Sequence, residues 1–164
     1  MSEKIALSGV PETMLQTVYA RARETQTRGA IRDEKAVELV RRLDYDFHHA
    51  EADTAMRSGV VARTIVLDRL TEAYLRAHPD AVVVNIACGL DARCYRMTGY
   101  THWYNLDLPE TIAVRRALLP DFRFVEEHCL TEGMAAFVLV YRLLDKLPAA
   151  RNISNRIVVL ERPA

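Results

Sequence analysis

The pattern of apolar and polar positions changes once along the chain, near residue 79. Before that point, apolar residues recur at helical spacing, which predicts helices over about 11–26, 34–43 and 58–77. Residues 44–56 lack sustained periodicity and are expected to form a polar loop. In the third helix, the apolar stripe expected to face the core comprises Val66, Leu67, Leu70 and Tyr74. The first 78 residues are therefore predicted to form a helical N-terminal lobe.

After Pro79, short apolar runs alternate with helical segments, which is typical of an α/β protein. Strands are predicted over about 81–86, 102–107, 122–127 and 157–160, and the first is expected to be buried on both faces. Asp91 is a candidate helix start, a second helix runs from Pro109 to Pro120, and a third follows Thr131. The apolar stripe of this last helix runs from Met134 to Leu147. The chain is predicted to be one domain, helical over 1–78 and α/β over 79–164.

One stretch of the α/β part has the pattern of a nucleotide-binding turn. Ala87-Cys88-Gly89 follow the first strand, and Asp107 ends the second strand eighteen residues after Gly89. Small residues let a ligand approach the backbone, and an acid at the end of the second strand can accept hydrogen bonds from ribose hydroxyls. The alternative is a plain strand-to-helix turn in which Asp107 caps the following helix. The spacing by itself favours neither of these two interpretations.

The identity of such a nucleotide stays open at this point. A dinucleotide fingerprint has Gly-x-Gly-x-x-Gly or Ala. This turn reads Ala87-x-Gly89-x-x-Ala92, so its first glycine is absent, which disfavours a nicotinamide dehydrogenase. S-adenosylmethionine has less need of a phosphate cradle and brings a carboxylate, for which Arg63 is a candidate partner. The alternative for Arg63 is an ordinary solvated arginine.

Composition narrows the class of partner. The chain has 164 residues, enough for one domain, with 22 Lys plus Arg against 22 Asp plus Glu. This balance gives no electrostatic case for nucleic acid or an anionic membrane, and no apolar run reaches membrane-spanning length. Cys88, Cys94 and Cys129 lack metal-ligand spacing and indicate reduced thiols in a cytoplasmic protein. Glu126 and Glu127 are expected to solvate the end of a strand.

Two motifs give the chain a resemblance to a known family. Val84-Asn-Ile-Ala-Cys-Gly-Leu-Asp-Ala-Arg93 and Tyr104-Asn-Leu-Asp-Leu-Pro109, preceded by Arg63, resemble the leucine carboxyl methyltransferase family. The similarity is closer to its bacterial branch of polyketide O-methyltransferase-like proteins, and it covers nearly the whole chain. It implies a Rossmann-like class I methyltransferase sheet behind the N-terminal helical lobe, with S-adenosyl-L-methionine as cofactor.

The resemblance also implies roles for single residues. Arg63 would pair with the methionine carboxylate of the cofactor, Gly89 would lie against the cofactor, and Asp107 would hold its ribose. Asn85 and Asp91 belong to the same motif and are expected beside the cofactor. The family usually has glycine at the position of Ala87, which also belongs to this set, and the extra methyl group there could crowd the cofactor.

The chain is short for this family. On the order of a hundred residues, several βα units, are expected to be absent between Pro120 and Phe122, together with much of the acceptor pocket. The first strand would then pair with the closing strands or leave an open edge through which two copies associate. The leading hypothesis is an O-methyltransferase acting on a carboxylate or hydroxyl of a small-molecule or polyketide-like acceptor. No convincing catalytic base is present, which favours a carboxylate acceptor or an inactive protein. The alternative is a non-catalytic remnant that self-associates.

Overall fold

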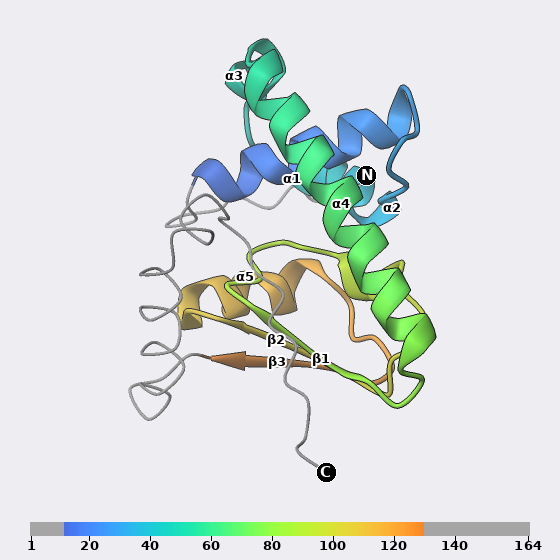
Figure 1. Ribbon diagram of the computed structural model, residues 1–164. Coiled ribbons are helices and arrows are strands. Elements are labelled where there is room, and N and C mark those ends of the chain that lie inside the picture. Colours follow the sequence, from blue (N-terminus) through green and yellow to red (C-terminus); the bar gives the residue numbers. More distant parts are fainter. Residues whose placement is uncertain (1–11, 130–164) are drawn as a thin grey trace, which may run out of the picture.

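The computed structural model describes residues 12–129, in which a group of helices stands over a small sheet (Figure 1). The elements in chain order are α1 (Glu12–Gln26), α2 (Glu34–Arg42), α3 (His48–Ala52), α4 (Thr54–Ala77), β1 (Val82–Ile86), the 3-10 turn η1 (Arg93–Tyr95), β2 (His102–Asp107), α5 (Pro109–Leu118) and β3 (Val125–Cys129). The helix predicted after Thr131 and the strand predicted over 157–160 lie outside the described residues.

Helix caps explain where the N-terminal helices begin. The Asp33 carboxylate accepts a hydrogen bond from Ala36 N–H at 3.0 Å, which starts α2 where the sequence predicts it. The expectation of a loop over 44–56 is wrong, because this stretch contains α3 and the start of α4. Asp53 caps α4 by accepting from Met56 N–H at 2.8 Å. A five-residue helix such as α3 is too short to show a periodic pattern.

The apolar stripe predicted for α4 is not the face that this helix buries. Val66 is 55% exposed and Leu70 is 61% exposed. The helix turns another face inward, whose buried members are Val60, Val61, Thr64, Thr71 and Leu75. The two threonine hydroxyls each donate to the carbonyl oxygen four residues earlier, at 2.8 Å. Their polar atoms are therefore satisfied inside the helix, and burying them costs little.

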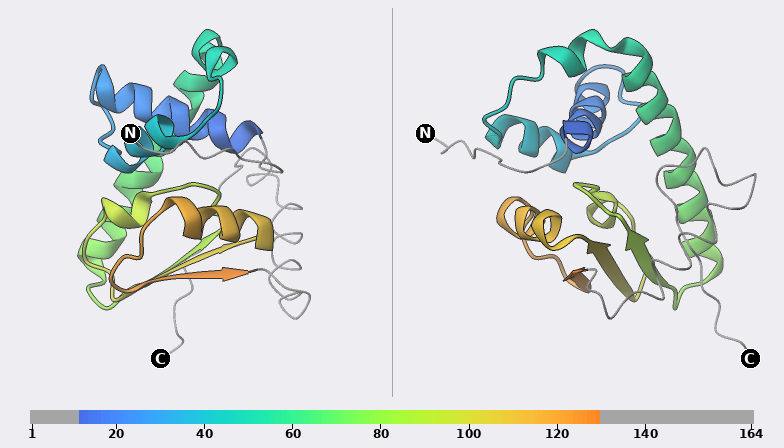
Figure 2. Two further views of the ribbon diagram at one scale, coloured as in Figure 1. Left: turned by 180° about the vertical axis from the view of Figure 1, so that it is seen from behind. Right: turned by 90° about the vertical axis from the view of Figure 1, so that its left-hand side faces the viewer.

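The sheet is parallel, with its three described strands in the order β1-β2-β3. α5 and the segment that contains η1 lie on one face of the sheet, below the N-terminal helices (Figure 2). This confirms the expected α/β class and its Rossmann-like sheet, of which residues 12–129 form three strands. It also corrects the expected position of the break between Pro120 and Phe122. β3 follows α5 and pairs in parallel with β2, so the chain beyond Pro120 continues the βαβ series.

Three local expectations in the α/β part differ from the structure. β1 is an edge strand of the described sheet, and Val82 is 55% exposed while Val83 is 8% exposed, so the strand is not buried on both faces. β3 begins at Val125, three residues later than predicted. No α-helix starts near Asp91, where the chain forms only the single turn η1. The Asp91 carboxylate accepts a hydrogen bond from Arg93 N–H at 3.1 Å, as a helix cap does. It is also buried, and it binds the side chains of Asn85 and Arg93.

The helices and the sheet share their apolar cores. Leu90, from the loop after β1, packs in one cluster with Leu118 of α5 and with Val18 and Leu39 of the N-terminal helices. A second cluster joins α4 to the sheet through Leu75, Val83 and Trp103. The loop after β1 is thus held between the helical lobe and the sheet. Within residues 12–129, no helix has the length and apolar character needed to cross a membrane.

Candidate functional site

The candidate site lies where β1 and β2 end. After β1 the backbone makes a left-handed turn, with φ +54° at Ala87 and φ +49° at Gly89. Gly89 N–H donates to Asp107 Oδ2 at 2.7 Å, and Leu108 N–H donates to Asp107 Oδ1 at 2.8 Å. Gly89 and Asp107, which are eighteen residues apart in the sequence, are therefore in direct contact, and the turn is bonded to the acid that ends β2.

The Asp107 carboxylate keeps acceptor capacity for a ligand. An ionised carboxylate offers about four acceptor positions on its two oxygens. The two backbone N–H groups use one position on each oxygen, and the side chain is half-buried. The remaining positions can accept hydrogen bonds from ligand hydroxyls.

Asn85 and Asp91 form a buried polar centre beneath the turn. Asn85 Nδ2 donates to Asp91 Oδ2 at 3.3 Å and to Asn105 Oδ1 at 3.1 Å. Asp91 also pairs with Arg93 Nη1 at 2.6 Å. Burial by itself raises the pKa of Asp91, but the positive charges around it prevail and lower this pKa to about 2; they belong to Arg93, Arg96, Arg21 and Arg115. Asp91 is therefore an ionised, internally satisfied carboxylate.

Arg63 reaches the same region from α4. Its side chain is half-buried, and its pKa is lowered by burial and by the charges of Arg21 and Arg93, with Asp91 acting in the opposite direction. A guanidinium can pair with the carboxylate of a ligand through charge-assisted hydrogen bonds, so Arg63 remains a candidate for that role.

Five of the six residues predicted from sequence lie at the ends of β1 and β2 or in the loop after β1. Hydrogen bonds join Gly89 to Asp107 and Asn85 to Asp91, while Ala87 occupies the turn just before Gly89. Arg63 is electrostatically coupled to Asp91.

Several charged residues of this region were missed by the sequence-based reasoning. Glu127, expected to be solvated, pairs with the fully buried Arg115, with 2.7 Å between Oε2 and Nε. Asp68 of α4 pairs with Arg93 Nε at 2.6 Å and with Arg96 Nε at 2.8 Å. One signal was available for Arg115, which lies three residues from Ile112 and Leu118 on the apolar face of α5.

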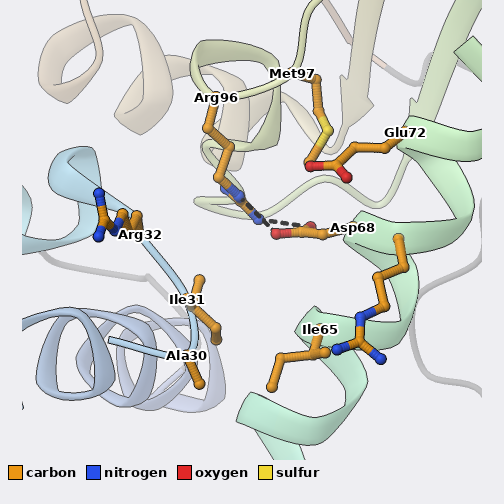
Figure 3. A pocket seen from close by; sticks show the side chains of 9 residues that line it. Ala30, Ile31, Arg32, Ile65, Asp68, Glu72, Arg96 and Met97 are labelled. Carbon is orange, nitrogen blue, oxygen red and sulfur yellow. Dashed lines mark hydrogen bonds and ion pairs between the residues drawn. The ribbon is translucent and has the colours of Figure 1, made fainter. Parts of the chain in front are cut away.

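A separate cavity of about 360 Å³ lies beside α4 (Figure 3). In it the Arg96 guanidinium binds the Asp68 carboxylate through Nε at 2.8 Å and Nη2 at 3.0 Å. The residues that line it come from the α1–α2 connection, α4 and the segment around η1; they are Ala30, Ile31, Arg32, Ile65, Asp68, Arg69, Glu72, Arg96 and Met97. None of the six predicted site residues belongs to this lining.

A parallel sheet with a small-residue turn after β1 and an acid at the end of β2 defines a Rossmann-like α/β protein. The sequence model of the leucine carboxyl methyltransferase family matches residues 14–138. The chain belongs to this family.

Two curated relatives refine the comparison. The tetracenomycin polyketide synthesis O-methyltransferase TcmP of Streptomyces glaucescens is 40% identical over 138 residues, covering 80% of this chain and 51% of the relative. The S-adenosyl-L-methionine-dependent methyltransferase dpfgK of Gibberella zeae is 28% identical over 130 residues, covering 72% of this chain and 44% of the relative. The chain spans about half the length of these relatives. No solved structure matches it.

Proposed function

We propose that this chain binds S-adenosylmethionine at the ends of β1 and β2 as part of an O-methyltransferase. The observation that carries the proposal is the 2.7 Å hydrogen bond from Gly89 N–H to Asp107, which sets a close-approach turn against a carboxylate with free acceptor positions. Family membership supports it, since both relatives are named as methyltransferases and one name specifies this cofactor.

Three of the predicted residues have a physical reason for their roles. Asp107 accepts hydrogen bonds from the ribose hydroxyls through the positions that its backbone donors leave open. Gly89 has φ +49° and contributes a turn without a side chain, against which the cofactor lies. A Cβ there would meet Met14 Sδ at 3.3 Å, so the packing of α1 also requires this glycine. Arg63 binds the methionine carboxylate, because a guanidinium and a carboxylate form a bidentate, charge-assisted pair.

The bound cofactor would supply a methyl group on a sulfonium, ready for in-line transfer. The chain's own contribution is then to orient the cofactor and exclude water, rather than to form a covalent bond. The acceptor is a carboxylate or hydroxyl of a small, polyketide-like molecule. A carboxylate is already nucleophilic and needs no general base, which agrees with the lack of one among the predicted site residues.

Isothermal titration of the full chain with S-adenosylmethionine tests the proposal. Arg63→Gln and Asp107→Asn should each weaken binding by about tenfold or more, the size expected for losing a charge-assisted hydrogen bond. Arg69→Gln on the exposed side of α4 and Asp121→Asn after α5 are matched controls that should keep the wild-type affinity. No heat at millimolar cofactor, or unchanged affinity in both site variants, would refute the proposed site.

A second candidate is a non-catalytic domain that self-associates. The exposed apolar side chains Val66, Leu70 and Val82, and the position of β1 at the edge of the described sheet, favour it. Size-exclusion chromatography with light scattering separates the two candidates. A monomer that binds S-adenosylmethionine contradicts the second one.

A further inference from the structure

The loop after β1 directs three successive carbonyl oxygens at two buried arginines. The oxygens of Gly89 and Asp91 accept hydrogen bonds from Arg115 Nη1 at 2.6 and 2.9 Å. The oxygen of Leu90, between them, accepts from Arg21 Nη2 at 2.9 Å. The backbone of residues 89–91 is therefore held by side chains of α5 and α1, which are far from it in the sequence.

Arg115 is fully buried, so its donors must be satisfied inside the protein. The side of its guanidinium that faces away from the loop pairs with Glu127 of β3, through Nε to Oε2 at 2.7 Å and Nη2 to Oε1 at 3.1 Å. Together with the two bonds to the loop, these contacts use most of the five donors that a guanidinium carries. The planar fork thus fixes the distance between β3 and the loop, which a lysine ammonium cannot do.

Arg21 ties the same loop to the helical lobe. Its side chain is buried, and its Nε binds Asp33 Oδ2 at 2.9 Å. Asp33 is also the cap of α2, so the joint between α1 and α2 is connected through one guanidinium to the Leu90 carbonyl. The loop is held from the lobe by Arg21 and from the sheet side by Arg115.

We propose that Arg115 and Arg21 are positioning residues that keep the turn at Gly89 in its cofactor-binding shape. By holding the carbonyl oxygens of residues 89–91, they keep Gly89 N–H on Asp107 and leave the small-residue side of the turn open. The role of this turn in binding a cofactor rests on the function proposed above. The positioning itself is a property of the chain without ligand, so it can be tested separately.

The test is to measure amide hydrogen exchange by NMR in the ligand-free full chain that carries Arg115→Lys. This variant keeps the charge and loses the fork. Gly89 N–H should exchange about tenfold faster, because its hydrogen bond to Asp107 depends on the held loop. Arg116→Lys is the matched control, since Arg116 is exposed and donates to the Glu127 carbonyl at 2.8 Å without touching the loop. Gly89 should exchange at the wild-type rate in this control.

The comparison with the sheet amides separates positioning from plain stability. The inference is supported if Arg115→Lys accelerates exchange more at Gly89 than at the amides of β1 and β2. Unchanged exchange at Gly89, or the same acceleration at all these amides, overturns it. Should Arg115→Lys fail to fold, Arg21→Lys, with exposed Arg23→Lys as control, makes the same comparison at the Leu90 end of the loop.

Titration with S-adenosylmethionine then links the loop to the proposed function. Arg115→Lys should raise the cofactor Kd about tenfold, while Arg116→Lys leaves it unchanged. An unchanged Kd in Arg115→Lys overturns the inference. A wild-type chain that binds no cofactor refutes the proposed function, and the Gly89 exchange rate still decides whether the arginines position the turn.

Discussion

Ala87→Gly is the substitution whose effect the backbone defines most sharply. Ala87 has φ +54°, a left-handed conformation that places the Cβ of an L-residue against its own carbonyl oxygen. Glycine has no Cβ and adopts this conformation without strain. The side chain of Ala87 is a single half-buried methyl group, so its removal takes away little packing. The change should therefore stabilise the fold, whereas most alanine-to-glycine changes destabilise it.

The expected size follows from two opposing terms. Relief of the left-handed conformation contributes about 1–2 kcal/mol. The greater freedom of glycine in the unfolded chain removes about 0.4–1 kcal/mol of that gain. The difference between these two terms spans about 0–1.6 kcal/mol, with its centre at about 0.8 kcal/mol, and such an increase in the free energy of unfolding raises the Tm of a domain of this size by about 2–3 °C.

Urea denaturation of the wild type and the variant measures this difference directly. Ala92→Gly is the control, because Ala92 lies in the same loop with φ −108° and a fully buried methyl group. It should lose about 1 kcal/mol or more, since it gains flexibility and relieves no strain. A loss of stability in Ala87→Gly similar to that in Ala92→Gly would show that the backbone at Ala87 is not under left-handed strain.

Two further predictions concern titratable groups. The pKa of Asp91 in the folded chain is lowered to about 2, below its ordinary value, so the stability that it contributes is present above about pH 4 and is lost as the pH falls towards 2. Urea denaturation between pH 5 and 2 should show this decline in the wild type and a flatter profile in Asp91→Asn; parallel profiles would contradict it. Burial raises the pKa of Cys88, and raises that of Cys94 to about 12, whereas Cys129 is only half-buried. Iodoacetamide at pH 8 should therefore label only Cys129 in the folded chain and all three cysteines after denaturation, which mass spectrometry of the tryptic peptides can check.

The sequence by itself determined those features that depend on neighbours along the chain. Asp33 as a cap and Pro109 in the first turn of a helix located the starts of α2 and α5, because capping and a fixed φ act within a few residues. The apolar runs located β1 and β2 to within a residue. The contact between Gly89 and Asp107 was also foreseeable, since the adjacent parallel strands that carry them end at the same edge of the sheet.

Only the tertiary structure decided which face of α4 is buried and which charges are internal. The local pattern favours Val66 and Leu70 over Thr64 and Thr71, yet the threonines satisfy their hydroxyls within the helix and are the residues that neighbouring elements cover. The partners of the buried arginines are equally remote. Arg115 and Gly89 lie 26 residues apart, and Arg21 and Leu90 lie 69 residues apart. A charge can be buried only where folding brings all its partners together, so its place is a property of the assembled fold.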